Sequence, residues 1–477
     1  MQRVFRSILA QAAFFPEKPA FILKERFLTY SLVVRAVASA QKAIASLKLS
    51  QDKPVGLLVD DPARHMIISL ALMGMGYTVA GLRDDLVETA RAYDIDVFVA
   101  DGAPRKLEGA TCHRISDAWF SAQDVGPPTA QEWSDTRAIR ITFTSGSTGR
   151  PKPIARTLPL LLSVVDDNIN YRIGSGERSI CMEGMSASGF PRTLAHLTFG
   201  KTVCFARLPD VLDLAQLYNA RSLTCTHRQL RTLLEIKREK RQSISFDFIA
   251  LGCGQLNGAQ QSEIRSAFGG QISSSYAGTE FGYAGIATAE VLNLRDSIGN
   301  CFSPIADVQI VDEERRPVAN GINGQIRVRV DHPSWTYSGH LERSPGEDVE
   351  WVYPGDYGFL NPHGLLVLTG RKDEIINDGG VRFDPEAMEV HLRRIKGLTD
   401  VAAIKMPVSD GAPQPWLAIV SEAAPSLEEI NAWIETSIPG ELGSVQFARL
   451  FELDSIPITA SGKVARQQLR EILSSRA

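Results

Sequence analysis

The sequence contains few cysteines, and their spacing indicates neither a disulfide framework nor a metal site. Six cysteines are scattered along 477 residues, with no Cys-x-x-Cys pair and no histidine set at metal-ligand spacing. Disulfides are rare in the cytosol, so this usage predicts reduced, buried thiols in a cytoplasmic protein. A disulfide-stabilised scaffold and a structural zinc domain are both excluded.

An excess of positive charge and a long apolar run are also missing. Lysine and arginine number 51 against 55 acidic residues, a formal net charge of -4. No basic surface for nucleic acid is therefore expected, and a small-molecule partner is favoured. The apolar stretch Met66–Met75 has the length of a buried helix, not of a membrane span. Gln11 interrupts the apolar run that follows Arg3 and Arg6, so no signal peptide is predicted and the protein is expected to be soluble.

The order of apolar patterns predicts an α/β fold. The length allows two or more domains with substantial cores. From about residue 30 to 275, candidate helices alternate with short apolar strands, which predicts layered α/β subdomains with parallel strands. Strand-like runs dominate the stretch from about 281 to 371, so a β-rich subdomain is expected there. We predict an N-terminal domain over 1–371 and a small, mobile α+β domain over 372–477.

A loop rich in glycine and hydroxyl groups is the strongest local signal. Its glycines can adopt positive φ, and its hydroxyls and lysine can bind phosphate oxygens; the residues are Thr144, Ser145, Gly146, Ser147, Thr148, Gly149 and Lys152. Pro151 and Pro153 flank the lysine, so the chain cannot enter a helix there as a Walker A loop does. The loop is predicted to join two strands. The alternation over 138–143 predicts that the first has one buried face.

This loop resembles the signature of the adenylate-forming superfamily, which includes acyl- and aryl-CoA synthetases, luciferases and the adenylation domains of peptide synthetases. Four further segments resemble its other motifs in the same order, namely Tyr276–Glu280, Tyr353–Gly358, Gly370–Ile375 and Ser461–Arg466. Each alone would be read as an ordinary turn, helix start or linker. Together they imply that a carboxylic acid is activated with ATP and then transferred to a thiol.

The resemblance also implies roles for individual residues. ATP would be bound with Mg²⁺, for which Glu280 is the ligand, while Thr279 would contact the α-phosphate. Lys463 would bridge the attacking carboxylate and that phosphate. The residues expected around adenine and ribose are Gly252, Cys253, Gly254, Ser275, Tyr276, Asp356 and Arg371.

In such enzymes the small domain then turns to allow the attack of the thiol. Asp373 matches the hinge, and Gly379 and Gly380 match the glycine pair beside which the pantetheine arm passes. The thiol is CoA or the phosphopantetheine of a separate carrier protein, and the sequence leaves both open. A silent nucleotide-binding scaffold is a third possibility, disfavoured by three intact charged residues, Lys463, Asp356 and Glu280.

The pocket for the acid is expected in the segment Met182–Phe190. Small residues such as Ser186 and Gly189 leave room for an acyl or aryl group, and the Phe-Asp dipeptide that holds an α-amino group in amino-acid-adenylating domains is missing. An α-amino acid substrate is therefore disfavoured. Three residues depart from the family pattern without removing a central charge, namely Ala277, Gln325 and Pro354.

Overall fold

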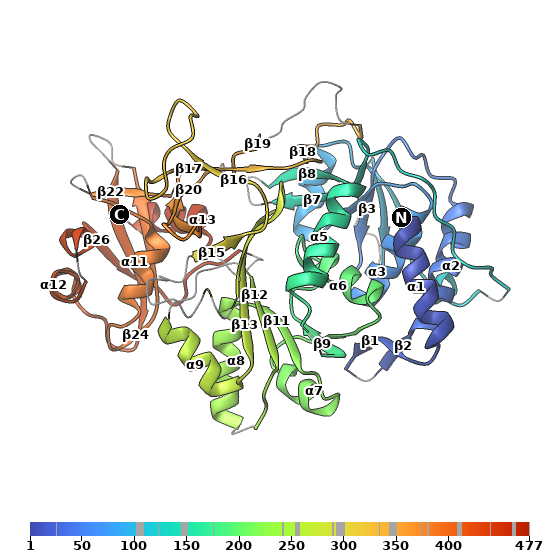
Figure 1. Ribbon diagram of the computed structural model, residues 1–477, viewed down its shortest axis with the longest axis horizontal. Helices are drawn as coiled ribbons and strands as arrows, with labels where there is room; N and C mark the ends of the chain where they lie inside the picture. The colour runs from blue at the N-terminus through green and yellow to red at the C-terminus, as the bar shows by residue number, and fades with distance from the viewer. Residues whose placement is uncertain are drawn as a thin grey trace.

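The structure, a computed structural model, describes residues 1–24, 26–101, 109–122, 124–144, 151–174, 176–240, 243–252, 258–288, 291, 301–332, 334–342, 351–372, 374–378, 381–407, 413–438, 440–459 and 464–476. The N-terminal and C-terminal elements lie toward opposite ends of its longest axis (Figure 1). Residues 1–371 are called the N-terminal region below, and residues 376–476 the C-terminal region.

The N-terminal region contains two large sheets, and the longer one has 14 strands. Part of this longer sheet is parallel, as predicted. Its strand order is β13-β12-β11-β9-β10-β1, and every neighbouring pair is parallel. These strands are β1 (Pro19–Leu23), β9 (Arg178–Cys181), β10 (Thr202–Phe205), β11 (Ser222–Thr226), β12 (Phe248–Gly252) and β13 (Gln271–Gly278). The strand β2 (Arg26–Thr29) pairs antiparallel with β1 at the edge. Residues that follow parallel strands meet at one edge of the sheet, where ligands bind in open α/β folds.

A second sheet carries the strands on either side of the predicted phosphate loop. Its order is β18-β8-β7-β4-β3-β5-β6, with antiparallel pairs only at β18-β8 and β8-β7. The strands are β3 (Val55–Leu58), β4 (Val79–Gly81), β5 (Val97–Ala100), β6 (Thr111–Arg114), β7 (Ala138–Thr144), β8 (Lys152–Thr157) and β18 (Trp335–Thr336). The hairpin β7–β8 confirms that the loop joins two strands.

Helices pack between these two sheets. One apolar core contains side chains from strands of both sheets and from the helices α1, α2, α3, α5 and α6, and Figure 1 shows α5 and α6 between them. The helices of this region are α1 (Gln2–Phe14), α2 (Tyr30–Ser46), α3 (Pro62–Gly74), α4 (Val87–Arg91), α5 (Leu158–Tyr171), α6 (Gly189–Thr198), α7 (Val211–Leu217), α8 (His227–Lys240) and α9 (Gly258–Phe268), with the 3₁₀ turns η1 (Asp84–Leu86) and η2 (Asp117–Trp119).

Capping residues fix the starts of several helices. Asp61 accepts hydrogen bonds from two backbone N–H groups of the first turn of α3, and Pro62 follows it at the first helical position. Thr157 caps α5 in the same way, so the chain turns from β8 directly into that helix. The phosphate hairpin is thereby fixed to the helical layer.

The longer sheet continues through antiparallel strands, which confirms the β-rich character predicted after residue 280. Its order here is β16-β17-β20-β21-β15-β14, and β19 pairs with β17. The strands are β14 (Gly282–Ala287), β15 (Cys301–Pro304), β16 (Val308–Val311), β17 (Gly324–Arg329), β19 (Trp351–Val352), β20 (Asp356–Leu360) and β21 (Leu366–Arg371).

The C-terminal region has sheets and cores of its own. One sheet is the hairpin β22–β23, and the other has the order β24-β25-β26. Two apolar cores consist of its residues alone. Its elements are β22 (Ile376–Asp378), β23 (Val381–Phe383), α11 (Pro385–Leu392), β24 (Leu398–Met406), β25 (Gln414–Ser421), α12 (Leu427–Ser437), η3 (Glu441–Ser444), β26 (Arg449–Glu452) and α13 (Arg466–Arg476).

One prediction about this architecture is wrong. The strand over 138–143 was expected to bury one face, but the structure buries both, and Arg140 is only 2% exposed. The reason is that β7 lies inside the sheet and α6 covers its polar face, where the Arg140 guanidinium stacks 3.9 Å from the centre of the Phe190 ring. Across the described ranges, no helix has the length and apolar character of a membrane span.

Candidate active site

Three residues predicted to bind the nucleotide meet at one corner, although they come from distant parts of the chain. Asp356 begins β20 and lies directly opposite Arg371, the last residue of β21. The Arg371 Nε is 3.7 Å from Asp356 Oδ1, and the Tyr276 hydroxyl donates to Asp356 Oδ2 at 2.7 Å. Burial, and then the charge of Asp356, raise the pKa of Tyr276 well above its usual value, so the phenol stays protonated and remains a donor.

Gly252 and Ser275 lie close together at the ligand-binding edge of the sheet. Gly252 is the last residue of β12, and Ser275 follows Ser274, whose register partner on β12 is Leu251. Tyr276 comes next on β13, and its ring packs 5.6 Å from that of Phe281. A contact of Gly252, Ser275 or Tyr276 with adenine stays a prediction, and Cys253 and Gly254 lie outside the described residues.

The stem of the phosphate hairpin is well defined. Thr144 and Lys152 are register partners at the ends of β7 and β8, and the Thr144 hydroxyl donates to the Lys152 carbonyl at 3.4 Å. The loop residues predicted between them lie outside the described residues, namely Ser145, Gly146, Ser147, Thr148 and Gly149. Thr279 and Glu280 follow β13, and Arg156 of β8 donates through Nε to the Thr279 carbonyl at 2.7 Å. The hairpin and the Tyr276–Glu280 motif are therefore in direct contact.

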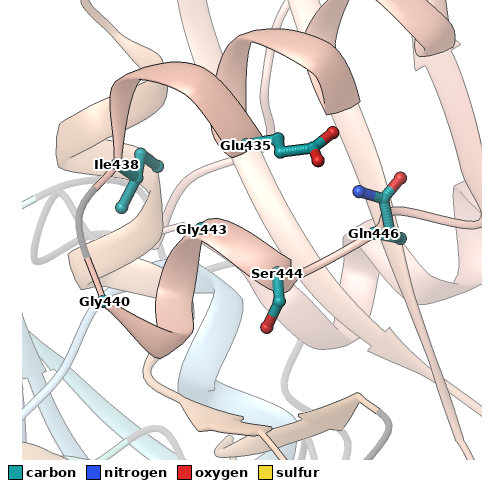
Figure 2. Close-up of a pocket in the computed structure, with 6 residues that line it drawn as sticks. All are labelled: Glu435, Ile438, Gly440, Gly443, Ser444 and Gln446. Carbon is teal, nitrogen blue, oxygen red and sulfur yellow. The ribbon is translucent and has the colours of Figure 1, made fainter.

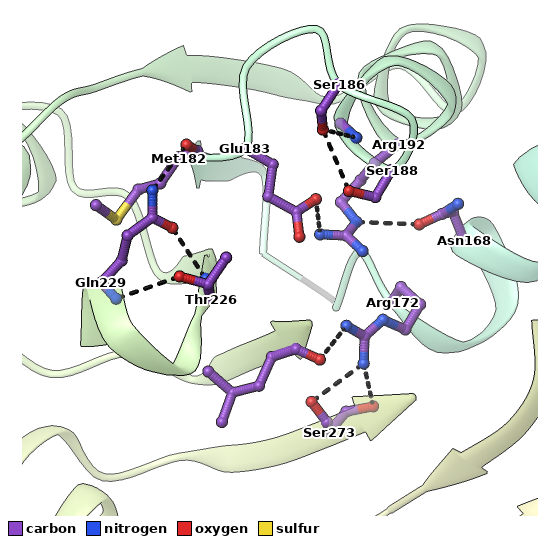
Figure 3. Close-up of polar contacts among 12 residues, drawn as sticks. Asn168, Arg172, Met182, Glu183, Ser186, Ser188, Arg192, Thr226, Gln229 and Ser273 are labelled. Carbon is purple, nitrogen blue, oxygen red and sulfur yellow. Dashed lines mark hydrogen bonds and ion pairs between the residues drawn. The ribbon is translucent and has the colours of Figure 1, made fainter. Parts of the chain in front are cut away.

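The segment expected to bind the acid connects β9 to α6. The Ser186 and Ser188 hydroxyls lie 3.3 Å apart (Figure 3). Ser186 also accepts a hydrogen bond from the backbone N–H of Gly189 at 3.1 Å. A Cβ on Gly189 would lie 2.1 Å from the carbonyl oxygen of Gly184, so this position requires glycine for packing. A contact of Ser186 or Gly189 with an acid stays a prediction.

Below this segment lies a buried ionic network that sequence reasoning missed. Glu183 and Arg192 form an ion pair at 2.6 Å, with side chains 3% and 2% exposed. Arg192 also donates to Asn168 Oδ1 at 3.1 Å and to the Tyr283 hydroxyl at 3.2 Å. Burial alone would lower the pKa of Arg192, but the charge of Glu183 raises it above its usual value. This ion pair connects the segment Met182–Phe190, called the acid segment below, to the side chain of Arg192 on α6.

Arg172 adds a second buried cation to this network (Figure 3). It donates to the Leu251 carbonyl at 2.7 Å and to the carbonyl and hydroxyl of Ser273 at 3.1 and 3.2 Å. Burial lowers its pKa to about 10, so the group remains a cation at neutral pH. No sequence signal distinguishes Arg172 or Arg192 from solvated arginines, because only the packing of α5 and α6 buries them.

The catalytic lysine, hinge and glycine pair predicted in the C-terminal part lie outside the described residues, namely Lys463, Asp373, Gly379 and Gly380. Their neighbours are defined. Asp378 and Val381 are register partners in the hairpin β22–β23, so the glycine pair connects its two strands. Arg466 begins α13 and donates to Glu389 Oε1 at 2.8 Å and to the Ala403 carbonyl at 2.6 Å.

A surface hollow in the C-terminal region is separate from these residues. Figure 2 shows its lining, formed by Glu435, Ile438, Gly440, Gly443, Ser444 and Gln446 between α12 and η3. None of them is a predicted nucleotide or acid residue. The candidate site is therefore the corner formed by β7–β8, β12, β13 and β20–β21.

Known proteins resemble this chain over most of its length. A sequence model of the family described as AMP-binding enzyme matches residues 8–337. A 2-succinylbenzoate--CoA ligase of Listeria monocytogenes serotype 4b (strain F2365) is 24% identical over 479 residues, covering 96% of this chain and 97% of the relative.

Two solved structures share the fold. The amide bond synthetase McbA from Marinactinospora thermotolerans has a TM-score of 0.80 at 20% identity, covering 98% of this chain and 99% of that one. The O-succinylbenzoate Coenzyme A Synthetase (MenE) from Bacillus subtilis, in complex with AMP, has a TM-score of 0.81 at 19% identity, covering 97% and 98%. The mixed α/β architecture of this chain is thus shared with these two proteins.

Proposed function

Because the chain belongs to the AMP-binding enzyme family, we propose that it joins a carboxylic acid to a thiol through an acyl-adenylate, releasing pyrophosphate and AMP. The observation that carries this proposal is the contact of Tyr276 and Arg371 with the two carboxylate oxygens of Asp356. A short, oriented carboxylate is suited to accept hydrogen bonds from both hydroxyls of a ribose. Three family motifs contribute to this one corner.

In the first half-reaction, the acid attacks the α-phosphorus of ATP while pyrophosphate leaves. Such a step depends on positioning and on neutralising charge. The loop between β7 and β8 would hold the outer phosphates, and Thr279 would contact the α-phosphate. Lys463 would bridge the attacking carboxylate oxygen and the α-phosphate while the new O–P bond forms and the bond to pyrophosphate breaks. Each of these groups stabilises negative charge.

Mg²⁺ would enter with ATP and offset the charge of the leaving pyrophosphate. The described residues contain no group of three or more acidic, histidine or cysteine side chains that could hold a metal ion alone. Glu280 as a single carboxylate beside the phosphates fits Mg²⁺, which is commonly bound by one or two carboxylates together with substrate phosphates. The donor set therefore fits a metal delivered by the nucleotide.

In the second half-reaction, the C-terminal region would turn about Asp373 and bring Gly379 and Gly380 toward the acyl-adenylate. We place the boundary between the two domains at residues 371 and 372. CoA is the proposed acceptor, because curated relatives that match over nearly the whole chain are named CoA ligases. The proposed substrate is an acyl or aryl acid without an α-amino group, since the segment Met182–Phe190 lacks the Phe-Asp dipeptide that holds an α-amino group in amino-acid-adenylating domains.

The test is exchange of labelled pyrophosphate into ATP, driven by a panel of fatty, aromatic and succinylated aromatic acids. One acid is expected to support exchange, and CoA is then expected to give the thioester. Thioester formation only with a carrier bearing phosphopantetheine would assign the alternative acceptor. AMP binding without exchange for any acid would instead indicate a nucleotide-binding scaffold and contradict the proposal.

Lys463→Ala separates the two half-reactions. The variant should lose roughly a hundredfold or more in exchange, because a preorganised cation stabilises the charge that develops in adenylation. It should still form thioester from a supplied acyl-adenylate. Equal loss of both activities would contradict a role confined to the first step.

A further inference from the structure

Arg156 contacts the nucleotide motif and the acid segment at the same time. Its Nε donates to the Thr279 carbonyl at 2.7 Å, and its Nη2 lies 3.5 Å from the Gly278 carbonyl. Its Nη1 donates to the Ala187 carbonyl at 3.2 Å. The residue is only 3% exposed. One guanidinium group therefore connects two loops that belong to different parts of the proposed site.

Arg140 is the natural comparison for Arg156. The two residues are register partners on β7 and β8, so their side chains project from the same face of the sheet. Arg140 donates through Nη2 to the Met185 carbonyl at 3.1 Å and stacks on Phe190. Among the described residues, the hydrogen bonds of Arg140 thus reach the acid segment, whereas those of Arg156 reach both loops.

Arg140 and Arg156 are two buried cations side by side, and apolar side chains could fill the same space without the cost of burying charge. Burial lowers the pKa of Arg140 to about 9, with a further decrease from the charge of Arg156. Burial also lowers the pKa of Arg156 to about 10, although the charge of Glu280 opposes this decrease. Both groups are cations at neutral pH despite this cost. What only arginine provides here is a planar set of donors with fixed directions, which lysine lacks.

We infer that Arg156 is a positioning residue for adenylation, which fixes the distance and orientation between Thr279 and the acid segment at Ala187. The inference rests on the proposed function, since Thr279 is there the α-phosphate contact and the segment around Ala187 holds the acid. Displacing one loop by about 1 Å relative to the other can cost a reaction roughly a hundredfold in rate. Arg156 would act through these two backbones without touching either substrate.

The test compares Arg156→Lys with Arg140→Lys in acid-dependent pyrophosphate exchange. Both variants keep the charge and remove the fixed donor geometry. For Arg156→Lys we expect kcat to fall about a hundredfold and the KM for both ATP and the acid to rise. For Arg140→Lys we expect a higher KM for the acid with the KM for ATP near the wild-type value. A wild-type kcat in Arg156→Lys, or the same kinetic pattern in both variants, would overturn the inference.

Titration with AMP keeps the inference testable apart from catalysis. Its stoichiometry reports the folded fraction, so partial unfolding cannot imitate a change in affinity. Arg156→Lys should weaken AMP binding several-fold, and Arg140→Lys should not. If the wild type binds AMP but none of the tested acids supports pyrophosphate exchange, the proposed function fails. The AMP titration still tests whether Arg156 positions the loop that contacts the nucleotide. Unchanged AMP affinity in Arg156→Lys would count against its positioning role, and a wild type that binds no AMP would overturn both proposals.

Discussion

Three buried arginines of the N-terminal region are held differently from Arg466 of the C-terminal region, while a fourth, Arg192, pairs with Glu183 as Arg466 pairs with Glu389. In the N-terminal region, Arg140 and Arg156 donate to backbone carbonyls, and Arg172 does so with one added hydroxyl. In the C-terminal region, Arg466 donates to Glu389 at 2.8 Å and lies 3.6 Å from Glu374. Burial lowers the pKa of the first three, whereas the two carboxylates raise that of Arg466 against the effect of burial.

This difference matches what each region faces in the proposed reaction. A guanidinium group held by carbonyls has no carboxylate hydrogen-bonded to it among the described residues, and its charge beside the β7–β8 hairpin would favour an anionic nucleotide and an acid. The charge of Arg466 is cancelled locally by Glu389, so that pair anchors α13, which begins three residues after Lys463. In the proposed reaction the first arrangement would attract the ligands, and the second would anchor the helix that follows the proposed catalytic lysine.

The largest expected effect comes from breaking the C-terminal pair. Glu389→Gln should cost about 3–5 kcal/mol of local stability, because it leaves the buried Arg466 guanidinium without its closest carboxylate. Glu389 also accepts the backbone N–H of Ala403 at 3.0 Å, so β24 should loosen with it. The measurement is amide hydrogen exchange across β24 and β25, which reports this region separately.

Removing both charges is the control. The double variant Glu389→Met with Arg466→Met should be considerably more stable than Glu389→Gln, since no buried charge is left unpaired. If Glu389→Gln costs less than about 1 kcal/mol of stability, carboxylates are no more important to Arg466 than carbonyls are to Arg172. The contrast between carboxylate-bound and carbonyl-bound arginines would then be wrong.

The second-largest expected effect is a pH dependence of stability caused by Asp384. This residue lies near Arg466 and caps α11. Burial, and then the charge of Glu386, raise its pKa from 3.8 to about 7, although Arg466 lowers it. The folded state therefore binds more protons than the unfolded state between these pH values. The stabilisation is complete below pH 3.8 and is lost as the pH rises through about 7. Its upper limit is about 4 kcal/mol at 1.36 kcal/mol per pKa unit.

Asp384→Asn keeps an acceptor for the backbone N–H of Glu386 and removes the titration. Thermal unfolding of both proteins between about pH 4 and pH 8 is the measurement. The wild type should lose stability relative to the variant as the pH rises. Parallel curves for the two proteins would show that Asp384 titrates normally.

A smaller effect is expected when a carbonyl-bound guanidinium is removed. Arg172→Met should cost about 1–3 kcal/mol, because it leaves the acceptors of Leu251 and Ser273 unsatisfied but leaves no buried charge unpaired. Hydrogen exchange of β12 and β13 would measure it. A cost equal to that of Glu389→Gln would show that the N-terminal arginines depend on charge compensation as strongly as Arg466 does.

Much of the fold could be predicted from the sequence, because periodicity and turn residues act locally. The hairpin β7–β8 follows from Pro151 and Pro153, and the parallel half of the longer sheet follows from the alternation of helices and strands. The meeting of Tyr276, Asp356 and Arg371 followed from the resemblance, since three distant motifs had to share one nucleotide.

The buried charges could not be predicted, because they depend on which faces the tertiary packing covers. The alternation of polar and apolar residues over 138–143 predicted the periodicity of β7, but it could not predict that α6 covers Arg140. Glu183 and Arg192 are nine positions apart, one after β9 and one in α6, and no local rule pairs them. The positions of Arg156 and Arg172 likewise require the register and the helical layer to be known.

The smallest effect is expected where the two regions touch. Arg228, in the first turn of α8, lies 3.8 Å from Asp400 of β24, with side chains 45% and 24% exposed. Arg228→Ala should change stability by less than about 1 kcal/mol, and the change should vanish near 1 M salt, where the Debye length is about 3 Å. Arg228 is the better site to truncate, because Asp400 also lies 3.9 Å from Arg393. Thermal unfolding at low and high salt measures the effect. A loss well above 1 kcal/mol that persists in salt would mean that this contact holds the two regions together. The rotation proposed for the second half-reaction would then have to break the contact in every turnover.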